Sequence, residues 1–457
     1  MTIFKKEKLH IETWGCQMNV ADSEQAASLL SDKYELCEEA SEADLIILNT
    51  CHIREKAYHK VTSRLGVLAN FKKKNPDLVI AVAGCSAQAE GKKLLKNKNV
   101  DLLVGPGRIK EISTLVEAAK GSNKKISALG FPKQELTEEE NELDKISYPT
   151  LSEERNEISR FVTIQQGCDN YCTFCIVPFT RGREISMSPL AVYNQAKAFV
   201  EAGAKEITLL GQNVNSYGLD LVKADKLKAS KEGPFADLLR LVASLPGLKS
   251  LRFTTSNPHD FTKPIADLFQ EHPLLGKYLH LPVQSGSNQV LELMKRKVTR
   301  EEFLERVTWL KEACPEITLS TDLIVGFPGE TEENFEETLS LVAQVRFAFA
   351  YAFKYSPRTH TPAARYKTQV PEEVKTDRLR RLNELLDQIT LEENEKELGK
   401  TRKVLFLYKS KKDGGVYCGR SEQFKLVKVP AGRDLTGEQL EVKITKATKT
   451  ALEGILV

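Results

Sequence analysis

The sequence predicts an α/β protein with three folded parts, and three observations along the chain lead to this fold class. Strand-like and helix-like segments alternate across residues 8–120, which is typical of an open parallel-sheet α/β domain. A second alternating series begins at Arg160 and repeats six times, too few for an eight-stranded barrel but suited to an incomplete, open one. Residues 401–457 hold short strand-like segments without helices, which favours a small β-barrel of the oligonucleotide-binding type.

In the N-terminal domain the expected strands are short apolar runs with helical patterns between them. The strands are expected at Leu9–Trp14, Ala43–Leu48, Asp77–Val82 and Val100–Val104, and helices at Ser23–Leu30 and Arg54–Asn70. Periodicity is then lost, and acidic residues gather at Thr137–Glu142. We therefore expect an N-terminal domain over 1–120, followed by an exposed acidic linker over 121–157.

The central domain is expected over 158–397. Its strands are predicted at Phe161–Gln165, Glu206–Leu210, Leu248–Thr254, Tyr278–Pro282, Thr318–Val325 and Phe347–Lys354. Helices are predicted at Leu190–Ala202, Glu302–Glu312 and Glu332–Val345, with a closing helix at Val374–Glu397. Aromatic residues recur at every second position of the last strand, which predicts one face of a buried strand rather than a base-stacking platform.

The C-terminal domain is expected over 398–457. Its strands are predicted at Val404–Tyr408, Gly415–Gly419, Phe424–Val429, Leu440–Thr445 and Ala451–Val457. Residues 400–457 carry 13 Lys and Arg against 6 Asp and Glu, although the whole chain has a net charge of only +3. A basic module on a mildly acidic body suggests nucleic acid, while solvated surface charge is the commoner explanation.

Composition and cysteine usage indicate a cytoplasmic protein. The 457 residues have ordinary globular composition, and no run reaches the length of a signal peptide or a membrane span. Nine cysteines is an odd number, which argues against a closed disulfide framework. In the cytosol thiols stay reduced and available to metal.

Three cysteines are closely spaced in the run Gly167-Cys-Asp-Asn-Tyr-Cys-Thr-Phe-Cys175. Three thiolates can hold a four-iron cube and leave one iron without a protein ligand, so that this iron can bind a small molecule. A zinc knuckle is the alternative, but it needs a fourth ligand at short range, and the next His or Cys is His259. The spacing of Cys168, Cys172 and Cys175 resembles that of the radical S-adenosylmethionine enzymes.

A second set of cysteines follows three predicted strands of the N-terminal domain, in Trp14-Gly-Cys16, Asn49-Thr-Cys51 and Ala83-Gly-Cys85. The carboxyl ends of parallel strands gather along one edge of a sheet, where ligands bind. Cys16, Cys51 and Cys85 can therefore meet and hold a second cluster. The alternative is that they are small buried hydrophobes near strand ends.

Taken together, these features resemble the methylthiotransferase family over essentially the whole chain. Several runs resemble its branch of tRNA 2-methylthio-N6-dimethylallyladenosine synthases (MiaB type), and the segment Ile-Arg-Glu-Lys-Ala at 53–57 best separates that branch from its relatives. The runs are Trp14–Asn19, Asn49–Ala57, Leu210–Tyr217, Leu281–Gly286 and Asp322–Gly329. The resemblance implies a radical-SAM partial barrel in the centre and a TRAM-like RNA-binding β-barrel at the C-terminus.

The resemblance also implies the reaction, the cofactors and the partners. Carbon 2 of adenine is an unactivated C–H position, so the family relies on two [4Fe-4S] clusters and on S-adenosyl-L-methionine, both as methyl donor and as radical source. We expect a cytoplasmic monomer that modifies dimethylallyladenosine next to the tRNA anticodon and takes electrons from an external one-electron reductant. No catalytic residue beyond the clusters is expected, in keeping with the lack of a Ser/His/Asp arrangement.

Polar residues at the ends of the barrel strands are the candidates for S-adenosylmethionine contacts, because active sites of βα barrels lie there. The candidates are Gln212, Asn213, Ser256, Asn257, Gln284, Ser285 and Asp322. An ordinary turn role is the alternative for each. Arg420 is a candidate RNA contact, and Arg181 and Arg183 are further candidates that could pair with a phosphate or a carboxylate.

Two other functions stay open on the sequence alone. The same chemistry could act on threonylcarbamoyl-adenosine in tRNA or on an aspartate of a ribosomal protein. The chain could also be an RNA-binding iron–sulfur redox protein without turnover. A vacant iron position disfavours the second possibility, since an electron carrier gains nothing from it.

Overall fold

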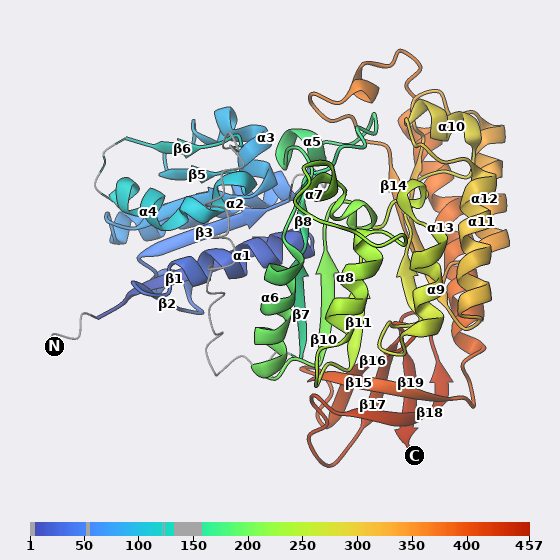
Figure 1. The fold of residues 1–457 in the computed structure, drawn as a ribbon. Coiled ribbons are helices and arrows are strands. Elements are labelled where there is room, and N and C mark those ends of the chain that lie inside the picture. The colour runs from blue at the N-terminus through green and yellow to red at the C-terminus, as the bar shows by residue number, and fades with distance from the viewer. Residues whose placement is uncertain (1–4, 52–54, 121, 123, 132–157) are drawn as a thin grey trace. The chain divides into compact units, whose positions relative to one another are not determined.

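A computed structural model describes most of the chain (Figure 1). The described residues are 5–51, 55–120, 122, 124–131 and 158–457. Most of the predicted linker 121–157, and residues 52–54 of the Asn49–Ala57 run, therefore lie outside the described residues. The chain forms two compact units. The first comprises Met1–Glu154, Gln166–Asp169 and Ile176–Ile185, and the second comprises Arg155–Gln165, Asn170–Cys175 and Ser186–Val457.

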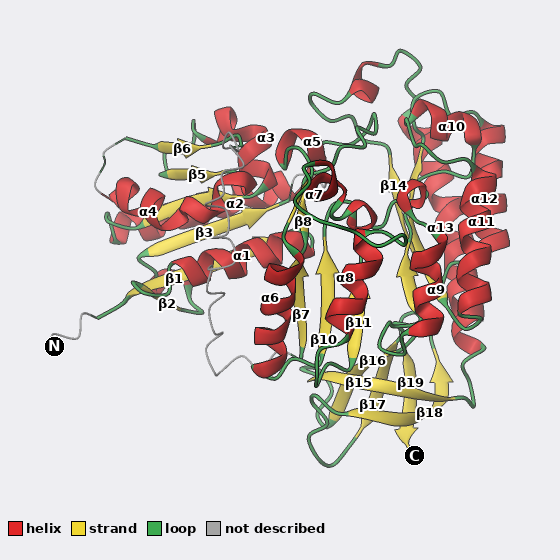
Figure 2. Cartoon of the chain, in the orientation of Figure 1, coloured by secondary structure: helices red, strands yellow, loops and turns green. Residues whose placement is uncertain are grey.

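The first unit is built on a six-stranded parallel sheet, which confirms the predicted α/β class for this part of the chain (Figure 2). Its spatial order is β2-β1-β3-β4-β5-β6. The strands are β1 (Glu7–Trp14), β2 (Tyr34–Leu36), β3 (Leu45–Thr50), β4 (Val79–Ala83), β5 (Leu102–Val104) and β6 (Ile126–Ala128), and the main helices are α1 (Gln17–Leu29), α2 (Glu55–Lys74), α3 (Cys85–Leu94) and α4 (Ile112–Lys120). The sequence prediction lacked β2 and β6, and β6 falls inside the predicted linker, so the sheet continues past residue 120.

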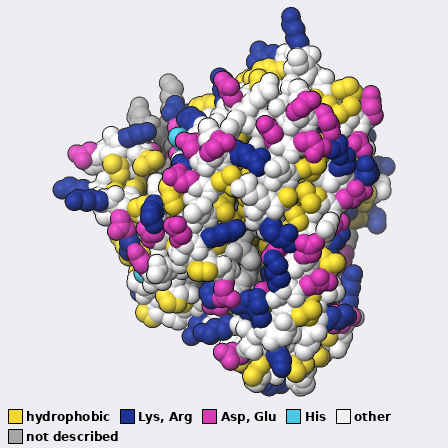
Figure 3. Space-filling view, turned by 90° about the vertical axis from the view of Figure 1, so that its right-hand side faces the viewer, with side chains coloured by type: hydrophobic (Ala, Val, Ile, Leu, Met, Phe, Trp, Pro, Cys, Tyr) yellow, Lys and Arg dark blue, Asp and Glu magenta, His cyan; other side chains and the backbone are white. Residues whose placement is uncertain are grey.

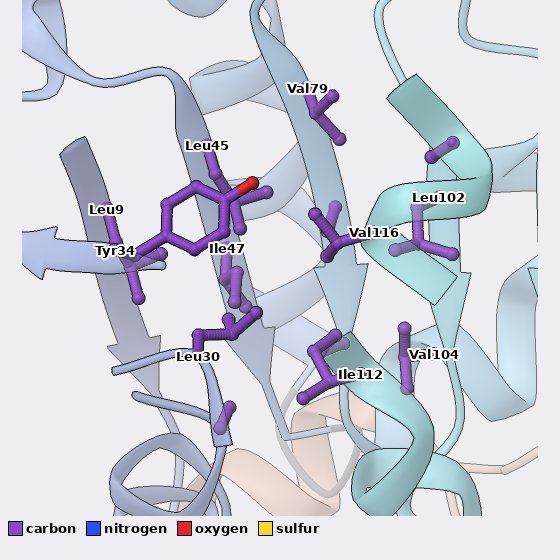
Figure 4. Packing of buried hydrophobic residues seen from close by; sticks show 14 of the residues in the cluster. Leu9, Leu30, Tyr34, Leu45, Ile47, Val79, Leu102, Val104, Ile112 and Val116 are labelled. Carbon is purple, nitrogen blue, oxygen red and sulfur yellow. The ribbon is translucent and has the colours of Figure 1, made fainter. Parts of the chain in front are cut away.

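Alternate residues of the strands pack on opposite faces of this sheet, as strand geometry requires. On one face Leu45 and Ile47 of β3 join a cluster with residues of α1 and α4 (Figure 4). On the other face Ile46 and Leu48 join a cluster with residues of α2 and α3. The central strands are therefore buried on both sides, which fixes where each strand can end.

The second unit contains six parallel barrel strands in two three-stranded sheets, β11-β10-β7 and β12-β13-β14, as predicted for a partial barrel. An isolated parallel bridge pairs Leu251 of β11 with Leu275, which precedes β12. The strands are β7 (Ser159–Thr163), β10 (Glu206–Leu210), β11 (Ser250–Phe253), β12 (Tyr278–His280), β13 (Thr318–Val325) and β14 (Phe349–Lys354).

Helices pack outside the barrel strands (Figure 2). They are α6 (Pro189–Glu201), α8 (Pro234–Ala243), α9 (Lys263–Glu271), α11 (Arg300–Ala313), α12 (Glu332–Val345) and α13 (Glu372–Glu395). Shorter elements are α5 (Val177–Thr180), α7 (Leu219–Lys223), α10 (Asn288–Leu293), β8 (Gln165–Gln166) and β9 (Ile185–Ser186).

The aromatic stripe of the last barrel strand differs from the prediction. Phe347 is fully buried, but it precedes β14, and Tyr351 and Phe353 on β14 are 50% and 39% exposed. The prediction of a buried strand face is therefore wrong for these two residues. The physical reason is that the barrel is open: among the strands that the structure describes, β14 is the edge strand of its sheet and pairs with β13 alone.

The C-terminal strands close into a five-stranded barrel in the order β15-β16-β17-β19-β18, as predicted. They are β15 (Thr401–Lys409), β16 (Val416–Ser421), β17 (Leu426–Pro430), β18 (Gln439–Ala447) and β19 (Leu452–Leu456). Val404, Phe406 and Val442 belong to its own apolar core. No helix among the described residues combines the length and the apolar character that crossing a bilayer would require.

The C-terminal barrel is attached to the partial barrel by aromatic and charged contacts. The Phe424 ring stacks on the Tyr278 ring of β12 with centroids 4.5 Å apart, and it lies 6.5 Å from the Phe349 ring. The buried Arg252 of β11 donates from Nε to Glu206 Oε2 at 2.7 Å and from Nη2 to the Ser421 carbonyl at 3.1 Å. The two modules therefore share one interface inside the second unit.

Replacing Phe424 by Ala should lower the free energy of unfolding by about 2–3 kcal/mol, because the stacked ring contacts are lost and a gap remains. Urea denaturation followed by circular dichroism measures the change. Tyr408→Ala is the control, since Tyr408 is 51% exposed, and it should cost about 0.5 kcal/mol. A loss below about 1 kcal/mol for Phe424→Ala would contradict the interface.

Candidate active site

The three N-terminal cysteines follow three neighbouring strands at the same edge of the sheet. Strands β1, β3 and β4 are adjacent, and Trp14 pairs with Thr50 while Asn49 pairs with Ala83. Cys16 caps α1, Cys51 directly follows β3, and Cys85 is the first residue of α3. The structure thus brings Cys16, Cys51 and Cys85 to one edge, as the sequence predicted. Their binding of a cluster stays a prediction.

The chain turns sharply at the glycines that precede two of these cysteines. Gly84 has φ +86°, and a Cβ there would lie 2.3 Å from Asn49 Oδ1 and 2.8 Å from the Thr50 carbonyl oxygen. A Cβ at Gly15 would lie 2.2 Å from Asn19 Oδ1. Only glycine lets the strand ends approach the amide groups this closely.

Buried amides hold the strand ends together. Asn19 Oδ1 accepts hydrogen bonds from the Cys16 backbone N–H at 3.3 Å and from the Cys16 thiol at 3.4 Å. Asn19 Nδ2 donates to Asn49 Oδ1, and Asn49 Nδ2 donates to the Asn19 carbonyl and to Ser23 Oγ. Ser86 Oγ donates to the Cys51 carbonyl at 2.7 Å. Sequence reasoning quoted the runs around Asn19 and Asn49 but assigned these side chains no role.

The thiols at this edge differ in their electrostatic environment. The pKa of Cys16 is lowered to about 6, chiefly by a hydrogen bond with the Cys51 thiol. Burial acts against this shift, and the positive charge of Arg181 adds to it. Burial raises the pKa of Cys85, and the Arg181 charge opposes that shift. A thiol of lowered pKa is mostly thiolate at neutral pH, and the thiolate is the metal-binding form.

Arg181 is a buried residue of the first unit, only 3% exposed. Its Nη2 donates to Asp22 Oδ2 at 2.6 Å. Burial alone would lower the pKa of the guanidinium, but the Asp22 carboxylate outweighs that effect and raises it. Of the two partners predicted for Arg181, a carboxylate or a phosphate, the structure shows a carboxylate, that of Asp22. An RNA contact at Arg181 stays a prediction.

The donor set at this edge suits an iron–sulfur cube better than a single ion. Within the described part of the chain, no three His, Cys, Asp or Glu side chains form a group that could hold one metal ion. A single zinc ion needs each sulfur about 2.3 Å from one point, whereas a cube spreads three thiolates over separate irons. Three soft thiolates at one edge therefore fit a cube.

The central cysteine run begins with a tight backbone contact in the first unit. Gly167 has φ +80°, and a Cβ there would lie 1.9 Å from the Arg183 carbonyl oxygen. The Cys168 N–H donates to the Gly182 carbonyl at 3.3 Å. Arg183 pairs with Asp169 through Nε and Nη2 at 2.7 and 2.9 Å, with its side chain 74% exposed. An RNA contact at Arg183 stays a prediction.

The rest of the run belongs to the second unit, where residues 293–296 hold it. The Thr173 N–H donates to the Met294 carbonyl, and Thr173 Oγ1 donates to the Leu293 carbonyl. Arg296 Nη1 lies 3.7 Å from the Cys172 sulfur, and Nη2 donates to the Pro282 carbonyl at 2.6 Å. Cys175 donates its N–H to the Cys172 carbonyl. Sequence reasoning missed Arg296, because nothing nearby in the chain marks its contact with the run.

Two of the candidate S-adenosylmethionine contacts retain buried atoms that no described residue satisfies. Asn213 follows β10 and is 1% exposed; its Nδ2 donates to Asp260 at 2.7 Å, but its Oδ1 has no hydrogen-bond partner. Ser256 follows β11, and its buried Oγ likewise has none. Gln212 lies beside Asn213 and is partly exposed. Asn213 and Ser256 therefore fit a polar ligand.

Other candidates are occupied by structural contacts. Asn257 Oδ1 accepts from the His259 N–H at 3.2 Å, which is a turn role. Ser285 Oγ bonds to Thr338 Oγ1 at 3.2 Å, and the backbone of Gln284 bridges to β13. Side-chain contacts of Asn257 and Ser285 with the cofactor are thus unsupported. Asp322 on β13 keeps a partly exposed carboxylate, 3.6 Å from His280 Nε2.

Arg420 lies inside the interface between the partial barrel and the C-terminal barrel. Its guanidinium sits over the Phe424 ring at 4.5 Å, and Nη1 donates to the Phe424 carbonyl at 3.1 Å. It lines one pocket with Lys249, Arg252 and Lys403. Arg420 is partly exposed at this interface, and its contact with RNA stays a prediction.

Comparison with known proteins gives matches over the whole chain. Residues 8–105 match the model of the uncharacterized protein family UPF0004, and residues 162–342 match the radical SAM superfamily. The chain is 43% identical over 454 residues to a tRNA-2-methylthio-N(6)-dimethylallyladenosine synthase of Geotalea uraniireducens, with 99% of both chains covered. A protein of the same name from Yersinia pseudotuberculosis is 41% identical, with 99% of this chain and 92% of the relative covered.

Solved structures of low sequence identity share the fold. One is the radical S-adenosylmethionine methyltransferase TsrM from Kitasatospora setae, with a TM-score of 0.57 and 13% identity over 79% of this chain and 77% of that chain. Another is the cobalamin-dependent S-adenosylmethionine radical enzyme OxsB, with a TM-score of 0.51 and 14% identity over 84% and 56% of the two chains. At these identities the likeness supports the fold alone.

Gly84→Ala should destabilise the protein by about 1–3 kcal/mol more than Gly130→Ala, because overpacking adds to backbone strain. Both glycines have positive φ, but a Cβ at Gly130 meets nothing within 4 Å, so Gly130→Ala is a matched control. Urea denaturation of the two variants measures the difference. Equal losses would show that the close approach to Asn49 and Thr50 costs nothing.

Proposed function

Because this chain belongs to the family of tRNA-2-methylthio-N(6)-dimethylallyladenosine synthases, we propose that it methylthiolates tRNA as a radical S-adenosylmethionine enzyme. It converts N6-(dimethylallyl)adenosine next to the anticodon into its 2-methylthio derivative. The observation that carries the proposal is 43% identity over 99% of both chains, a span that includes both three-cysteine sets. The arrangement of Cys16, Cys51 and Cys85 on three adjacent strand ends supports it.

The reaction explains why the chain offers thiolates instead of acid–base groups. Carbon 2 of adenine carries a C–H bond that neither a base nor a nucleophile opens at neutral pH. A bound [4Fe-4S] cluster together with S-adenosylmethionine supplies the one-electron chemistry that such a bond requires. The part of the protein is to hold the cofactor, the base and the sulfur source in reacting geometry.

The spacing of Cys168, Cys172 and Cys175 in the sequence supports these three residues as the ones that would hold the radical-forming cluster. Arg296, anchored on the Pro282 carbonyl, directs Nη1 toward the Cys172 sulfur and so supports that thiolate. Asn213 Oδ1 is an acceptor suited to the amino group of S-adenosylmethionine, and Ser256 Oγ can donate to its carboxylate. Both atoms lie at strand ends, where barrel enzymes bind substrate.

In the first unit, Cys16, Cys51 and Cys85 would hold a second [4Fe-4S] cluster, and such a cluster would supply the sulfur atom. The three strand ends offer three thiolates, so one iron keeps a position that no cysteine fills. Asn19 and Ser86 fix the backbone of the cysteine turns through buried hydrogen bonds.

The partners follow from the family and from the charge of the C-terminal barrel. Exposed Lys411 and Lys412, in the turn after β15, are placed to contact tRNA phosphates. One face of the molecule shows basic and acidic side chains mixed without a continuous basic patch (Figure 3). The enzyme acts in the cytoplasm as a monomer and draws electrons from an external one-electron reductant.

Two clusters imply about eight irons per chain after anaerobic reconstitution. Cys172→Ala should lower the iron content to about four and abolish 5′-deoxyadenosine formation. Replacing Cys16, Cys51 and Cys85 together by Ala should also leave about four irons, but with S-adenosylmethionine cleavage retained. Iron analysis and chromatography of the nucleoside products measure both results.

Cys37→Ala is the control for these variants, because Cys37 is a partly exposed free cysteine outside both sets. It should change neither the iron content nor the cleavage. If the triple variant still bound about eight irons, the second cluster would lie elsewhere.

The purified enzyme should methylthiolate tRNA that carries dimethylallyladenosine and leave tRNA without that group unchanged. Mass spectrometry of digested nucleosides measures the product. Product found on threonylcarbamoyl-adenosine or on a ribosomal protein aspartate, with none on dimethylallyladenosine, would move the chain to a sister branch of the family.

A further inference from the structure

A polar cavity lies inside the second unit, where the C-terminal barrel meets the partial barrel. Its volume is about 150 Å³, and a cavity of this size takes a group as large as a benzene ring. Ser250, the first residue of β11, lines it together with residues of β15, β16 and β18. The cavity therefore lies at the amino end of a barrel strand, whereas Asn213 and Ser256 follow the carboxyl ends of β10 and β11.

The inner wall of the cavity contains a fixed guanidinium. Arg252 is 7% exposed, its Nε donates to Glu206 Oε2 at 2.7 Å, and its Nη2 donates to the Ser421 carbonyl at 3.1 Å. A Cβ at Gly276 would lie 2.3 Å from Arg252 Nη1, so only glycine leaves room for the guanidinium. Nη1 reaches the Glu422 carbonyl only at 3.5 Å. Because each terminal nitrogen carries two N–H groups, Arg252 keeps donors beyond these contacts.

Positive charge exceeds negative charge around the cavity. Glu206 neutralises Arg252, and the Glu422 carboxylate lies 3.5 Å from Lys277 Nζ. Glu422 is the one acidic residue in the cavity lining. Three further cations line the cavity without an ion pair to any residue that the structure describes: Lys249, Lys403 and Arg420. The protein itself therefore leaves this concentration of positive charge uncompensated.

Attachment of the C-terminal barrel explains only part of this arrangement. The guanidinium groups of Arg252 and Arg420 lie 4.9 and 4.5 Å from the centroid of the Phe424 ring, so both help to hold that ring. Burial lowers the pKa of Arg420, and the neighbouring charge of Arg252 acts in the same direction. Lys249 and Lys403 are exposed and contribute nothing to the attachment. An anion in the cavity would account for all four cations.

The donor set indicates the chemistry of that anion. Lys and Arg side chains only donate hydrogen bonds, so the ligand has to be an acceptor. Charged donors bind carboxylate and phosphate oxygens most strongly. A carboxylate offers two oxygens and one negative charge, whereas a phosphate group offers more oxygens to donors that approach from several sides. Four cationic side chains from two modules therefore fit phosphate better.

We propose that this cavity binds a phosphate group, with Arg252 and Arg420 as the inner donors and Lys249 and Lys403 at the exposed rim. The chemistry is the same for a phosphate of a polynucleotide backbone and for a free phosphate ion. Neither the clusters nor the reaction at adenine enters into this binding, so its failure would leave the proposed function standing.

The test uses the full-length protein after anaerobic reconstitution, with inorganic phosphate as the probe. Isothermal titration calorimetry in a phosphate-free buffer measures the affinity, and sodium chloride keeps the ionic strength constant. Arg420→Gln should weaken phosphate binding by about tenfold to a hundredfold, because a charged hydrogen-bond donor is lost. Urea denaturation of each variant shows whether the fold is retained.

A second variant separates binding from attachment of the barrel. Lys249→Ala combined with Lys403→Ala should weaken phosphate binding by about threefold to tenfold, because two exposed charges are lost. Its free energy of unfolding should stay unchanged. The matched control is Lys311→Ala combined with Lys443→Ala, which removes two exposed lysines of the same unit outside the cavity lining. The control should bind phosphate as the unchanged protein does.

An RNA hairpin without the dimethylallyl group distinguishes the two sources of phosphate. If the Lys249 and Lys403 double variant binds the hairpin more weakly than the control variant does, the cavity holds a backbone phosphate. If the double variant loses affinity for inorganic phosphate alone, the cavity holds a free phosphate ion. Equal affinities of the cavity variants and the control for both probes would overturn the proposal, and so would a lack of saturable binding of either probe to the unchanged protein.

Discussion

The arrangement of the N-terminal site depends on the parallel register of three adjacent strands. Because β1, β3 and β4 run in the same direction and pair near their carboxyl ends, the residues that follow them are delivered to one edge. The glycines before Cys16 and Cys85 let the chain turn there, and the pair Asn19 and Asn49 ties the strand ends together through buried amides. A shift of one strand by one residue would move its cysteine away from the other two.

The sequence was sufficient for the fold class because the longer strands and helices carry clear periodicity. β10, β13 and α12 have the predicted bounds. Most other predicted elements differ from the observed ones by a few residues at their ends, but the helix predicted at Ser23–Leu30 begins six residues after α1 (Gln17–Leu29) begins. β2 and β6 were missed because each has only three residues. The exposure of Tyr351 was missed for another reason. The alternation of aromatic residues assigns them to one face of a strand, but it does not show whether that face is covered.

The candidate site was predictable where close spacing in the sequence or the topology of parallel strands brings residues together. The cysteines could be found from strand ends and spacing, whereas Arg181 with Asp22 and Arg296 with Cys172 are contacts between distant parts of the chain. Arg181 shows how sequence alone can mislead. A basic residue after a cysteine loop suggests a phosphate contact, and only the structure shows that this side chain is buried. Asn257 shows another error, because a polar residue at a strand end can stabilise a local turn instead of binding a ligand.

Unpaired buried atoms distinguish ligand-binding residues from structural ones only in combination with their position. The amide of Gln423 also lacks partners among the described residues, yet it lies in the C-terminal barrel, away from any strand end that faces a reaction. Asn213 Oδ1 and Ser256 Oγ are unpaired at the carboxyl ends of barrel strands. Glu330, equally buried, is fully engaged by Arg378 and the Gly326 N–H and so holds the scaffold. In this chain, a buried donor or acceptor without a partner therefore indicates a ligand only where the strand topology also predicts a ligand site.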